Sequence, residues 1–317
     1  MKRFPFAHTF SIVAYDAASG QMGVAVQSHW FSVGSVVAWA EAGVGVVATQ
    51  ALAEVGYGPQ GLEKMRNGST APQALVELLA ADDLREVRQV AMLDAAGRNA
   101  VHTGQRCMAA AGQEKGEGFS VQANMMLNDT VWAAMARAYK AARGELAERL
   151  LVTLEAAQAA GGDVRGQQSA AMLIVETGKP AKTWEGVVLD LRVEDHPQPI
   201  AELRRLVVVQ RAYAHMNRGD ALLGKGDVDG ALLAYQSAAE IAPGMDELPF
   251  WQAVTLTDLG RLEEALPIFQ RVFHANPNWA VLLERLPPAG MMKENPAAMK
   301  KILALAGATG YKNDTKN

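Results

Sequence analysis

Residues 9–28, TFSIVAYDAASGQMGVAVQS, carry the pattern that decides the fold of the first part of this chain. Thr9–Asp16 is rich in aromatic and β-branched residues, which is typical of a β-strand. Ala17–Gly20 has the small and polar residues of a turn and ends on glycine, and Gln21–Ser28 has the composition of a second strand. The segment therefore predicts an antiparallel β-hairpin.

The register of this hairpin brings polar residues together. If the four-residue turn carries no bulge, Thr9 falls opposite Ser28, and His29 follows directly. Two hydroxyl groups and an imidazole would then share one edge of the sheet. Ordinary surface polar groups fit the same spacing, so the spacing alone does not define a functional site.

Strand and helix patterns continue to residue 192. Glycine-punctuated apolar runs and a second hairpin pattern precede Ala/Leu-rich helical stretches at 128–160, and strand patterns return at 169–192. Strand runs that flank paired helices predict an α+β fold, in which two sheets pack on each other and helices lie outside. We place this first domain at residues 1–205.

Residues 206–317 are predicted to form a second, all-helical domain that contains an internal repeat. The repeated positions lie 34 residues apart and resemble those of tetratricopeptide repeats: Gly226 and Gly260, Ala231 and Ala265, Tyr235 and Phe269, Pro243 and Pro277. A small residue lets two helices approach, the aromatic residue fills the space between them, and proline ends the second helix. We expect residues 212–280 to bind a protein partner, with residues 280–306 as a cap and a short polar tail after them.

The composition excludes several classes of function. The chain has 317 residues, with 30 Lys and Arg against 34 Asp and Glu, and no basic stripe that would indicate nucleic-acid binding. Cys107 is the single cysteine, which excludes intramolecular disulfides and cysteine-cluster zinc sites. The six histidines are scattered, so no metal site is expected, although carboxylate ligands stay open.

Targeting and cofactor signals are also weak. The apolar stretch near the start is broken by Pro5 and too short for a secretory signal, and the longest apolar runs are too short to span a membrane. We therefore expect a soluble, cytoplasmic protein. Gly43–Ala48 matches G-x-G-x-x-A, but it lies in a valine-rich strand pattern and not at a strand-to-helix turn, so no cofactor is expected.

Seven segments, in order over residues 8–205, resemble the successive blocks of a bacterial family, the domain-of-unknown-function family numbered 1028. They are His8–Ala14, Gly23–Ser28, Ala48–Gln50, Tyr57–Pro59, Gly118–Asn124, Gln168–Ala171 and Leu191–His196. The family is grouped with the N-terminal-nucleophile hydrolases. The resemblance implies a four-layer αββα sandwich and, by analogy with that superfamily, the hydrolysis of an amide bond.

The resemblance also implies roles for individual residues. Thr9, once it is N-terminal, would be the nucleophile through its hydroxyl group and the base through its own α-amine, whose pKa of about 7.7–8.0 leaves much of it neutral near pH 8. Asn124 would point its amide at the developing oxyanion. Ser28 or Gln50 would orient the amine or the substrate. Buried amides that satisfy loop backbone explain Asn124 and Gln50 equally well.

Three further residues are candidates for binding the substrate. His29 and Trp30 follow the hairpin directly and would line a pocket for an apolar or planar group. Aromatic residues of the core are the competing interpretation. Tyr57 belongs to one of the segments that carry the family resemblance.

The position of Thr9 decides between two functions. Eight residues precede it, so either the His8–Thr9 bond is cleaved, or the true start of the chain lies elsewhere, or this copy cannot use the α-amine. With the leader attached, the nitrogen of Thr9 is an amide without useful basicity. The first hypothesis is an amide hydrolase that acts on a small amide or peptide. The alternative is a non-catalytic binding or scaffold protein that acts through its helical repeats. Either is compatible with a homodimer.

Overall fold

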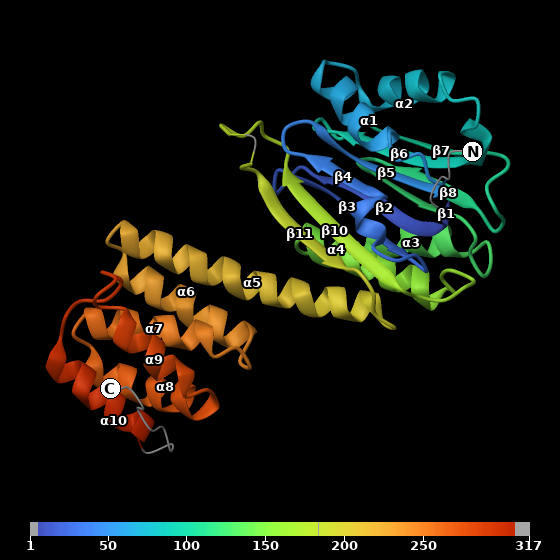
Figure 1. Ribbon diagram of the computed structural model, residues 1–317. Coiled ribbons are helices and arrows are strands. Elements are labelled where there is room, and N and C mark those ends of the chain that lie inside the picture. Colours follow the sequence, from blue (N-terminus) through green and yellow to red (C-terminus); the bar gives the residue numbers. More distant parts are fainter. Residues whose placement is uncertain (1–5, 183, 308–317) are drawn as a thin grey trace. The chain divides into compact units, whose positions relative to one another are not determined.

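The computed structural model describes residues 6–182 and 184–307 and divides into two compact units, residues 1–207 and residues 208–317. The first unit contains both β-sheets, and the second is helical throughout its described residues (Figure 1). The mixed α+β class of the first part and the all-helical class of the second are therefore confirmed. Each unit is described by itself below.

The first unit contains a five-stranded antiparallel sheet. Its order is β1-β5-β6-β7, and β4 also pairs with β5. The strands are β1 (Phe6–Ala7), β4 (Ala38–Glu41), β5 (Gly45–Leu52), β6 (Arg88–Asp94) and β7 (Asn99–Thr103).

A six-stranded antiparallel sheet has the order β11-β10-β3-β2-β9-β8. The hairpin of the opening segment forms β2 and β3 at its centre, and Thr9 lies opposite Ser28 as the four-residue turn predicts. The strands are β2 (Thr9–Asp16), β3 (Gln21–Ser28), β8 (Gly112–Gly116), β9 (Phe119–Ala123), β10 (Ser169–Glu176) and β11 (Val187–Val193).

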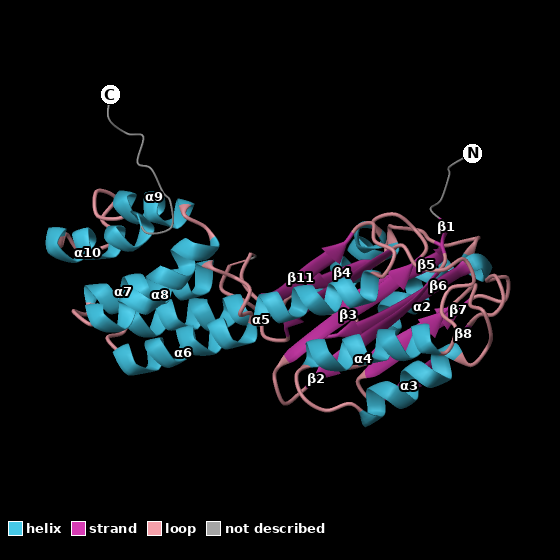
Figure 2. Ribbon diagram, turned by 90° about the horizontal axis from the view of Figure 1, so that it is seen from below, coloured by secondary structure: helices cyan, strands magenta, loops and turns pink. Residues whose placement is uncertain are grey.

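Helices cover the outer face of each sheet (Figures 1 and 2). On the five-stranded sheet lie α1 (Tyr57–Arg66) and α2 (Ala71–Ala80), and on the six-stranded sheet α3 (Val131–Ala141), α4 (Leu146–Ala159) and the first residues of α5 (Pro199–Gly224). The start of α2 is fixed by a capping box in which Thr70 and Gln73 each bond the other's backbone N–H. Two short 3-10 helices, η1 (Val33–Ser35) and η2 (Arg85–Val87), complete the unit.

The space between the two sheets is apolar over most of its length and polar at one end. Alternate residues of a strand face the same side, so Val13, Ser11 and Thr9 of β2 all point between the sheets. Val24 of β3 and Val46 of β5 continue the apolar part, where burying each such side chain contributes about 1.5–3 kcal/mol. The polar end lies where β2 begins, and it holds the candidate site.

The second unit contains the 34-residue repeat that the sequence predicts. Its helices are the remainder of α5, then α6 (Val228–Ile241), α7 (Glu247–Asp258), α8 (Leu262–Ala275), α9 (Asn278–Arg285) and α10 (Pro296–Gly307). Ala231 and Ala265 are completely buried, and Phe269 lies in the core of the unit. Gly226 and Gly260 both have positive φ, of 80° and 78°, which explains why glycine recurs at this position of the repeat.

Within the described residues, no helix combines the length and the apolar character that crossing a membrane requires.

Candidate functional site

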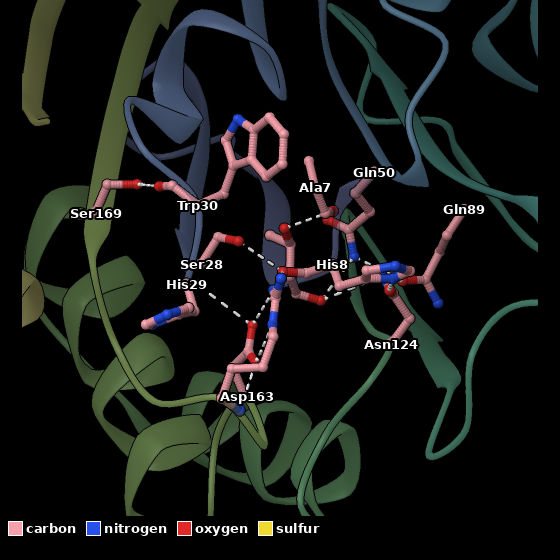
Figure 3. A network of polar contacts seen from close by, with 12 residues as sticks. Ala7, His8, Ser28, His29, Trp30, Gln50, Gln89, Asn124, Asp163 and Ser169 are labelled. Carbon is pink, nitrogen blue, oxygen red and sulfur yellow. Dashed lines mark hydrogen bonds and ion pairs between the residues drawn. The ribbon is translucent and has the colours of Figure 1, made fainter. Parts of the chain in front are cut away.

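Four of the predicted site residues meet at the polar end between the sheets. Thr9 begins β2, Ser28 ends β3, Gln50 lies near the end of β5 and Asn124 directly follows β9. Each is completely buried. Figure 3 shows Ser28, Gln50 and Asn124 converging on the segment that contains His8. Residues far apart in the sequence thus form one polar cluster.

The His8–Thr9 peptide bond lies at the centre of this cluster. The carbonyl oxygen of His8 accepts hydrogen bonds from Ser28 Oγ at 2.6 Å and from Arg165 Nη2 at 2.9 Å. The hydroxyl of Thr9 donates to the carbonyl oxygen of Ala7 at 2.7 Å. The carbonyl of His8 therefore receives two strong donors, and the hydroxyl of the next residue is held by the carbonyl of the residue before His8.

Arg165 is held in place by Asp163. Its Nε and Nη2 donate to Asp163 Oδ1 and Oδ2 at 3.0 and 2.7 Å, and its backbone N–H donates to Oδ1 at 2.9 Å. The carboxylate of Asp163 is fully buried and also accepts from the backbone N–H of His29 at 3.3 Å. Such a two-pronged ion pair fixes the plane of the guanidinium group, so its donor stays aimed at His8.

The carbonyl oxygen of Thr9 has its own set of donors. It accepts from the backbone N–H of Asn124 at 3.1 Å, from Asn124 Nδ2 at 3.4 Å and from Gln50 Nε2 at 3.2 Å. The carbonyl oxygen of His8 instead accepts from Ser28 and Arg165, so the role expected of Asn124 at a developing oxyanion stays a prediction. Asn124 and Gln50 anchor the first residue of β2.

Gln89 sets the direction of the Asn124 amide. Its Nε2 faces three acceptors, Thr103 Oγ1 at 2.8 Å, Gly112 O at 3.2 Å and Ala123 O at 3.0 Å. Its Oε1 is therefore the atom that accepts from Asn124 Nδ2, at 2.9 Å. With Nδ2 used in this way, Asn124 Oδ1 is left to face the imidazole of His8.

The imidazole of His8 lies in this cluster in its neutral form. Burial lowers its pKa below the ordinary value, and the positive charge of Arg165 lowers it too, against the opposing effects of the bond to Asn124 and of Asp163. Its Nδ1 lies 2.6 Å from Asn124 Oδ1, which can only accept, so Nδ1 carries the proton.

The backbone is strained directly beside two of these residues. Ala51 has a φ of 71° and Met125 a φ of 59°, and they follow Gln50 and Asn124. A left-handed conformation at a non-glycine residue costs about 1–3 kcal/mol and persists where the surrounding structure imposes it, which is frequent at functional sites.

The other three predicted site residues, His29, Trp30 and Tyr57, lie outside the cluster formed by Thr9, Ser28, Gln50 and Asn124. The backbone of His29 contacts Asp163, and the backbone carbonyl of Trp30 accepts from Ser169 Oγ, so these two border the cluster (Figure 3). Tyr57 lies elsewhere. Its hydroxyl donates to Asp82 Oδ2 at 3.1 Å, and burial raises its pKa. Tyr57 lines a separate cavity of about 190 Å³, whose lining residues include none of the other predicted site residues.

Sequence reasoning missed Gln89, Asp163 and Arg165. A signal existed for Gln89, because Ala91 and Leu93 on the same strand face the inter-sheet core and the alternation places Gln89 beside them. No periodic signal existed for Asp163 and Arg165, which lie between α4 and β10. Within the described residues, no group of three or more His, Cys, Asp and Glu side chains is arranged to hold a metal ion.

Fold and site together define an α+β domain of two packed antiparallel sheets, with a buried hydroxyl and amide cluster where the central hairpin begins, followed by a helical repeat. Residues 9–203 match a family described as "Family of unknown function (DUF1028)", and the chain belongs to this family. Residues 222–286 match a tetratricopeptide repeat family. Both resemblances noted in the sequence are thereby confirmed.

One solved structure supports this assignment. The crystal structure of protein SPO2555 from Silicibacter pomeroyi, described under the same family, is 30% identical to this chain and superposes with a TM-score of 0.57. The match covers 63% of this chain and 88% of that protein. A comparison with curated proteins gives no match.

Proposed function

We propose that this protein is an amide hydrolase of the N-terminal-nucleophile type, with a four-layer αββα sandwich, in which Thr9 becomes the nucleophile after the His8–Thr9 bond is cut. The observation that carries the proposal is the pair of hydrogen bonds from Ser28 and Arg165 to the carbonyl oxygen of His8. Donors fixed around one backbone carbonyl are suited to stabilise the negative charge that forms there when a nucleophile attacks.

The cleavage of the chain is the first reaction. Thr9 Oγ attacks the carbonyl carbon of His8, and charge develops on the oxygen that Ser28 and Arg165 hold. The C–N bond then breaks, the acyl group of His8 passes to Thr9 Oγ as an ester, and the freed nitrogen takes the proton of the hydroxyl. Water hydrolyses the ester, which leaves a carboxylate on His8 and a free α-amine on Thr9.

Turnover of an external substrate repeats this chemistry. The α-amine of Thr9 takes the hydroxyl proton and Oγ attacks the carbonyl carbon of a small amide or peptide. The leaving amine takes that proton as the C–N bond breaks, and water hydrolyses the acyl-enzyme with the α-amine as base. Ser28 and Arg165 contact the oxygen in both reactions, while Gln50 and Asn124 hold the carbonyl of Thr9.

Burial of the cluster supports the order of these reactions. Thr9 and Ser28 are completely buried, and their hydroxyls donate to the carbonyl oxygens of Ala7 and His8, so an external substrate has no access before cleavage. The released leader would uncover the same hydroxyl that it now covers.

Intact-mass measurement of the purified full chain tests the proposal. We expect the wild-type protein to lose the mass of residues 1–8, the Thr9→Ala variant to keep it, and the Thr9→Ser variant, which retains the hydroxyl, to lose it. The Thr153→Ser variant, at a buried threonine of α4, is the matched control and should be cleaved normally. Amide hydrolysis by a wild-type chain that keeps its leader would end the proposal.

The helical unit favours a second function, the binding of a basic peptide. A cavity of about 520 Å³ is lined by aromatic, aliphatic, methionine and acidic side chains, among them Trp251, Asp220 and Asp258, and by the basic side chain of Lys293. The Nζ of Lys293 donates to the backbone carbonyl oxygen of Asp258 at 2.9 Å, so the two carboxylates stay available to a ligand. The hydroxyl of Tyr235 donates to Asp220 Oδ1 at 2.6 Å. Carboxylates beside aromatic faces suit a Lys or Arg side chain flanked by apolar residues.

This second function is tested on the full chain with a fluorescein-labelled peptide of alternating Lys and Leu, against a Glu and Leu peptide. We expect the Asp220→Asn/Asp258→Asn variant to bind the basic peptide about tenfold more weakly, and the exposed control Asp229→Asn to bind it as wild type does. Equal anisotropy titrations for the two peptides would contradict this function.

A further inference from the structure

The residues before Thr9 complete one edge of the five-stranded sheet. β1 pairs antiparallel with β5, with Ala7 opposite Ala51, whereas β4 pairs with the same strand only as far as Ala48. On its other side β5 is paired with β6. Cleavage after His8 would therefore release a strand whose removal leaves backbone groups of β5 unpaired beside the new N-terminus. An unpaired edge of this kind binds an extended chain as an added strand.

The position of Ala7 requires a small side chain. Ala7 is completely buried and belongs to the apolar core between the sheets, together with Val33, Val37 and Ala53. A larger residue in so tightly packed a place costs about 1–3 kcal/mol. A chain that took the place of β1 would therefore carry alanine or glycine one residue before its reacting carbonyl.

The position of His8 requires a hydrogen-bond donor. Gln89 turns the amide of Asn124 so that its Oδ1 faces this position, and His8 Nδ1 meets that oxygen at 2.6 Å. His8 is 5% exposed and Asn124 is completely buried, so the oxygen of Asn124 would lose its partner without gaining access to water if an apolar side chain stood at position 8. A site of this kind rejects residues that lack the donor, because the buried acceptor is left unpaired.

We propose that residues 6–8 occupy the acyl side of the substrate site and so identify the substrate, an inference that rests on the proposed function. The substrate is an extended peptide that adds to the edge of β5. It is cleaved on the carboxyl side of a residue whose side chain carries an uncharged N–H or O–H donor, as histidine does at position 8. The residue before that one is alanine or glycine, as at position 7. The amide bond after that residue breaks, its acyl group passes to Thr9 Oγ, and water releases it as a carboxylic acid.

Three fluorogenic peptide amides of 7-amino-4-methylcoumarin test this inference on the purified mature chain. Acetyl-Phe-Ala-His reproduces residues 6–8. Acetyl-Phe-Ala-Leu replaces histidine by leucine and so lacks the side-chain hydrogen-bond donor. Acetyl-Phe-Leu-His keeps histidine but has leucine in the place of Ala7. We expect kcat/KM for the first to exceed the other two by about tenfold or more. In a measurement without turnover, the acid acetyl-Phe-Ala-His should slow hydrogen exchange at residues 50–53 of the mature chain, and acetyl-Phe-Ala-Leu should not.

The outcomes separate the inference from the function on which it rests. One outcome is a chain that begins at Thr9, hydrolyses simple amides, loses this activity in the Thr9→Ala variant, and has the same kcat/KM for all three peptides. The substrate assignment is then wrong and the proposed function stands. If the chain keeps residues 1–8 and hydrolyses nothing, the proposed function fails and the substrate assignment falls with it. Preference for the Ala-His peptide together with protection of β5 supports both.

Discussion

The hydroxyl of Ser28 donates a hydrogen bond of 2.6 Å to the carbonyl oxygen of His8, the oxygen of the peptide bond that joins His8 to Thr9. The pairing of β2 with β3 produces this contact, because Thr9 and Ser28 are register partners at the open end of the hairpin. A donor on the neighbouring strand therefore reaches the carbonyl just before the first residue of β2. In an ordinary hairpin that carbonyl would face water or a neighbouring strand.

Removal of the Ser28 hydroxyl should slow cleavage of the chain. In the Ser28→Ala variant the carbonyl oxygen of His8 loses the bond from Ser28 and keeps the bond from Arg165. Loss of one such donor costs about 10²–10³ in rate. We expect newly made Ser28→Ala protein to accumulate with residues 1–8 attached, as followed by intact mass over time after synthesis.

The control for this variant is Ser120→Ala. Ser120 is also completely buried on a central strand, and its hydroxyl contacts Gln122 Oε1 at 3.3 Å instead of His8. It should be cleaved at the wild-type rate. Cleavage of Ser28→Ala at that same rate, with an unchanged circular dichroism spectrum, would remove Ser28 from the reaction.

The part of the site that lies on strands was predictable from the sequence. The four-residue turn determines that Thr9 meets Ser28, and the period of two along a strand places Ser11 and Thr9 on the face of Val13. The 34-residue spacing likewise predicted the helical repeat, because each repeat unit needs its small residue and its aromatic residue at the same helix contact.

The part of the site that lies on loops was not predictable. Arg165 is 157 positions from His8, and the loop that carries it is placed by the packing of α4 and β10 and by the buried carboxylate of Asp163. The pairing of the two-residue β1 with β5 also has no local signal, since so short a strand has no periodicity of its own. Tertiary contacts decide both.

Acidification should destabilise the chain that retains its leader. Burial lowers the pKa of His8, so the folded chain holds the imidazole neutral, while in the unfolded chain it takes up a proton near pH 6.5. The unfolded state therefore binds more protons as the pH falls below 6.5, and the folded state loses stability over that range. Comparison of the melting temperatures of Thr9→Ala and Thr9→Ala/His8→Gln at pH 7.5 and pH 5.5 measures this effect.

Glutamine keeps an N–H donor for Asn124 but does not titrate. The decrease in melting temperature between the two pH values should therefore be smaller in the double variant. Equal decreases in both proteins would show that His8 is not held neutral in the folded chain.

The single cysteine should react slowly in the folded protein. The pKa of the Cys107 thiol is raised to about 11, mainly by burial and also by the negative charge of Glu86, against the opposing hydrogen bond from the backbone of Gly104. The thiol also donates to the carbonyl oxygen of Arg88 at 3.2 Å. Because the thiolate is the reactive form, and two pKa units change its population about a hundredfold, alkylation at pH 8 should be about a hundredfold slower than in the unfolded chain.

Mass spectrometry after timed exposure to iodoacetamide measures that difference, with the chain in guanidinium chloride as its own control. Cys107 is the single cysteine of the sequence, so each added carbamidomethyl group reports on this one site. Similar rates in the folded and unfolded chain would show that the thiol is neither buried nor raised in pKa.

The helical repeat should depend on the small residues at its helix contacts. Ala265 of α8 is completely buried and packs in the same core as Phe250 and Phe269, so the Ala265→Leu variant forces extra volume into a filled space and should lose about 1–3 kcal/mol of stability. Ala221→Leu is the matched control, because Ala221 lies on an exposed face of α5 and a surface change of this kind stays within about 0.5 kcal/mol. Urea unfolding followed by the helical signal at 222 nm compares the two, and a transition unchanged in Ala265→Leu would contradict close packing at this contact.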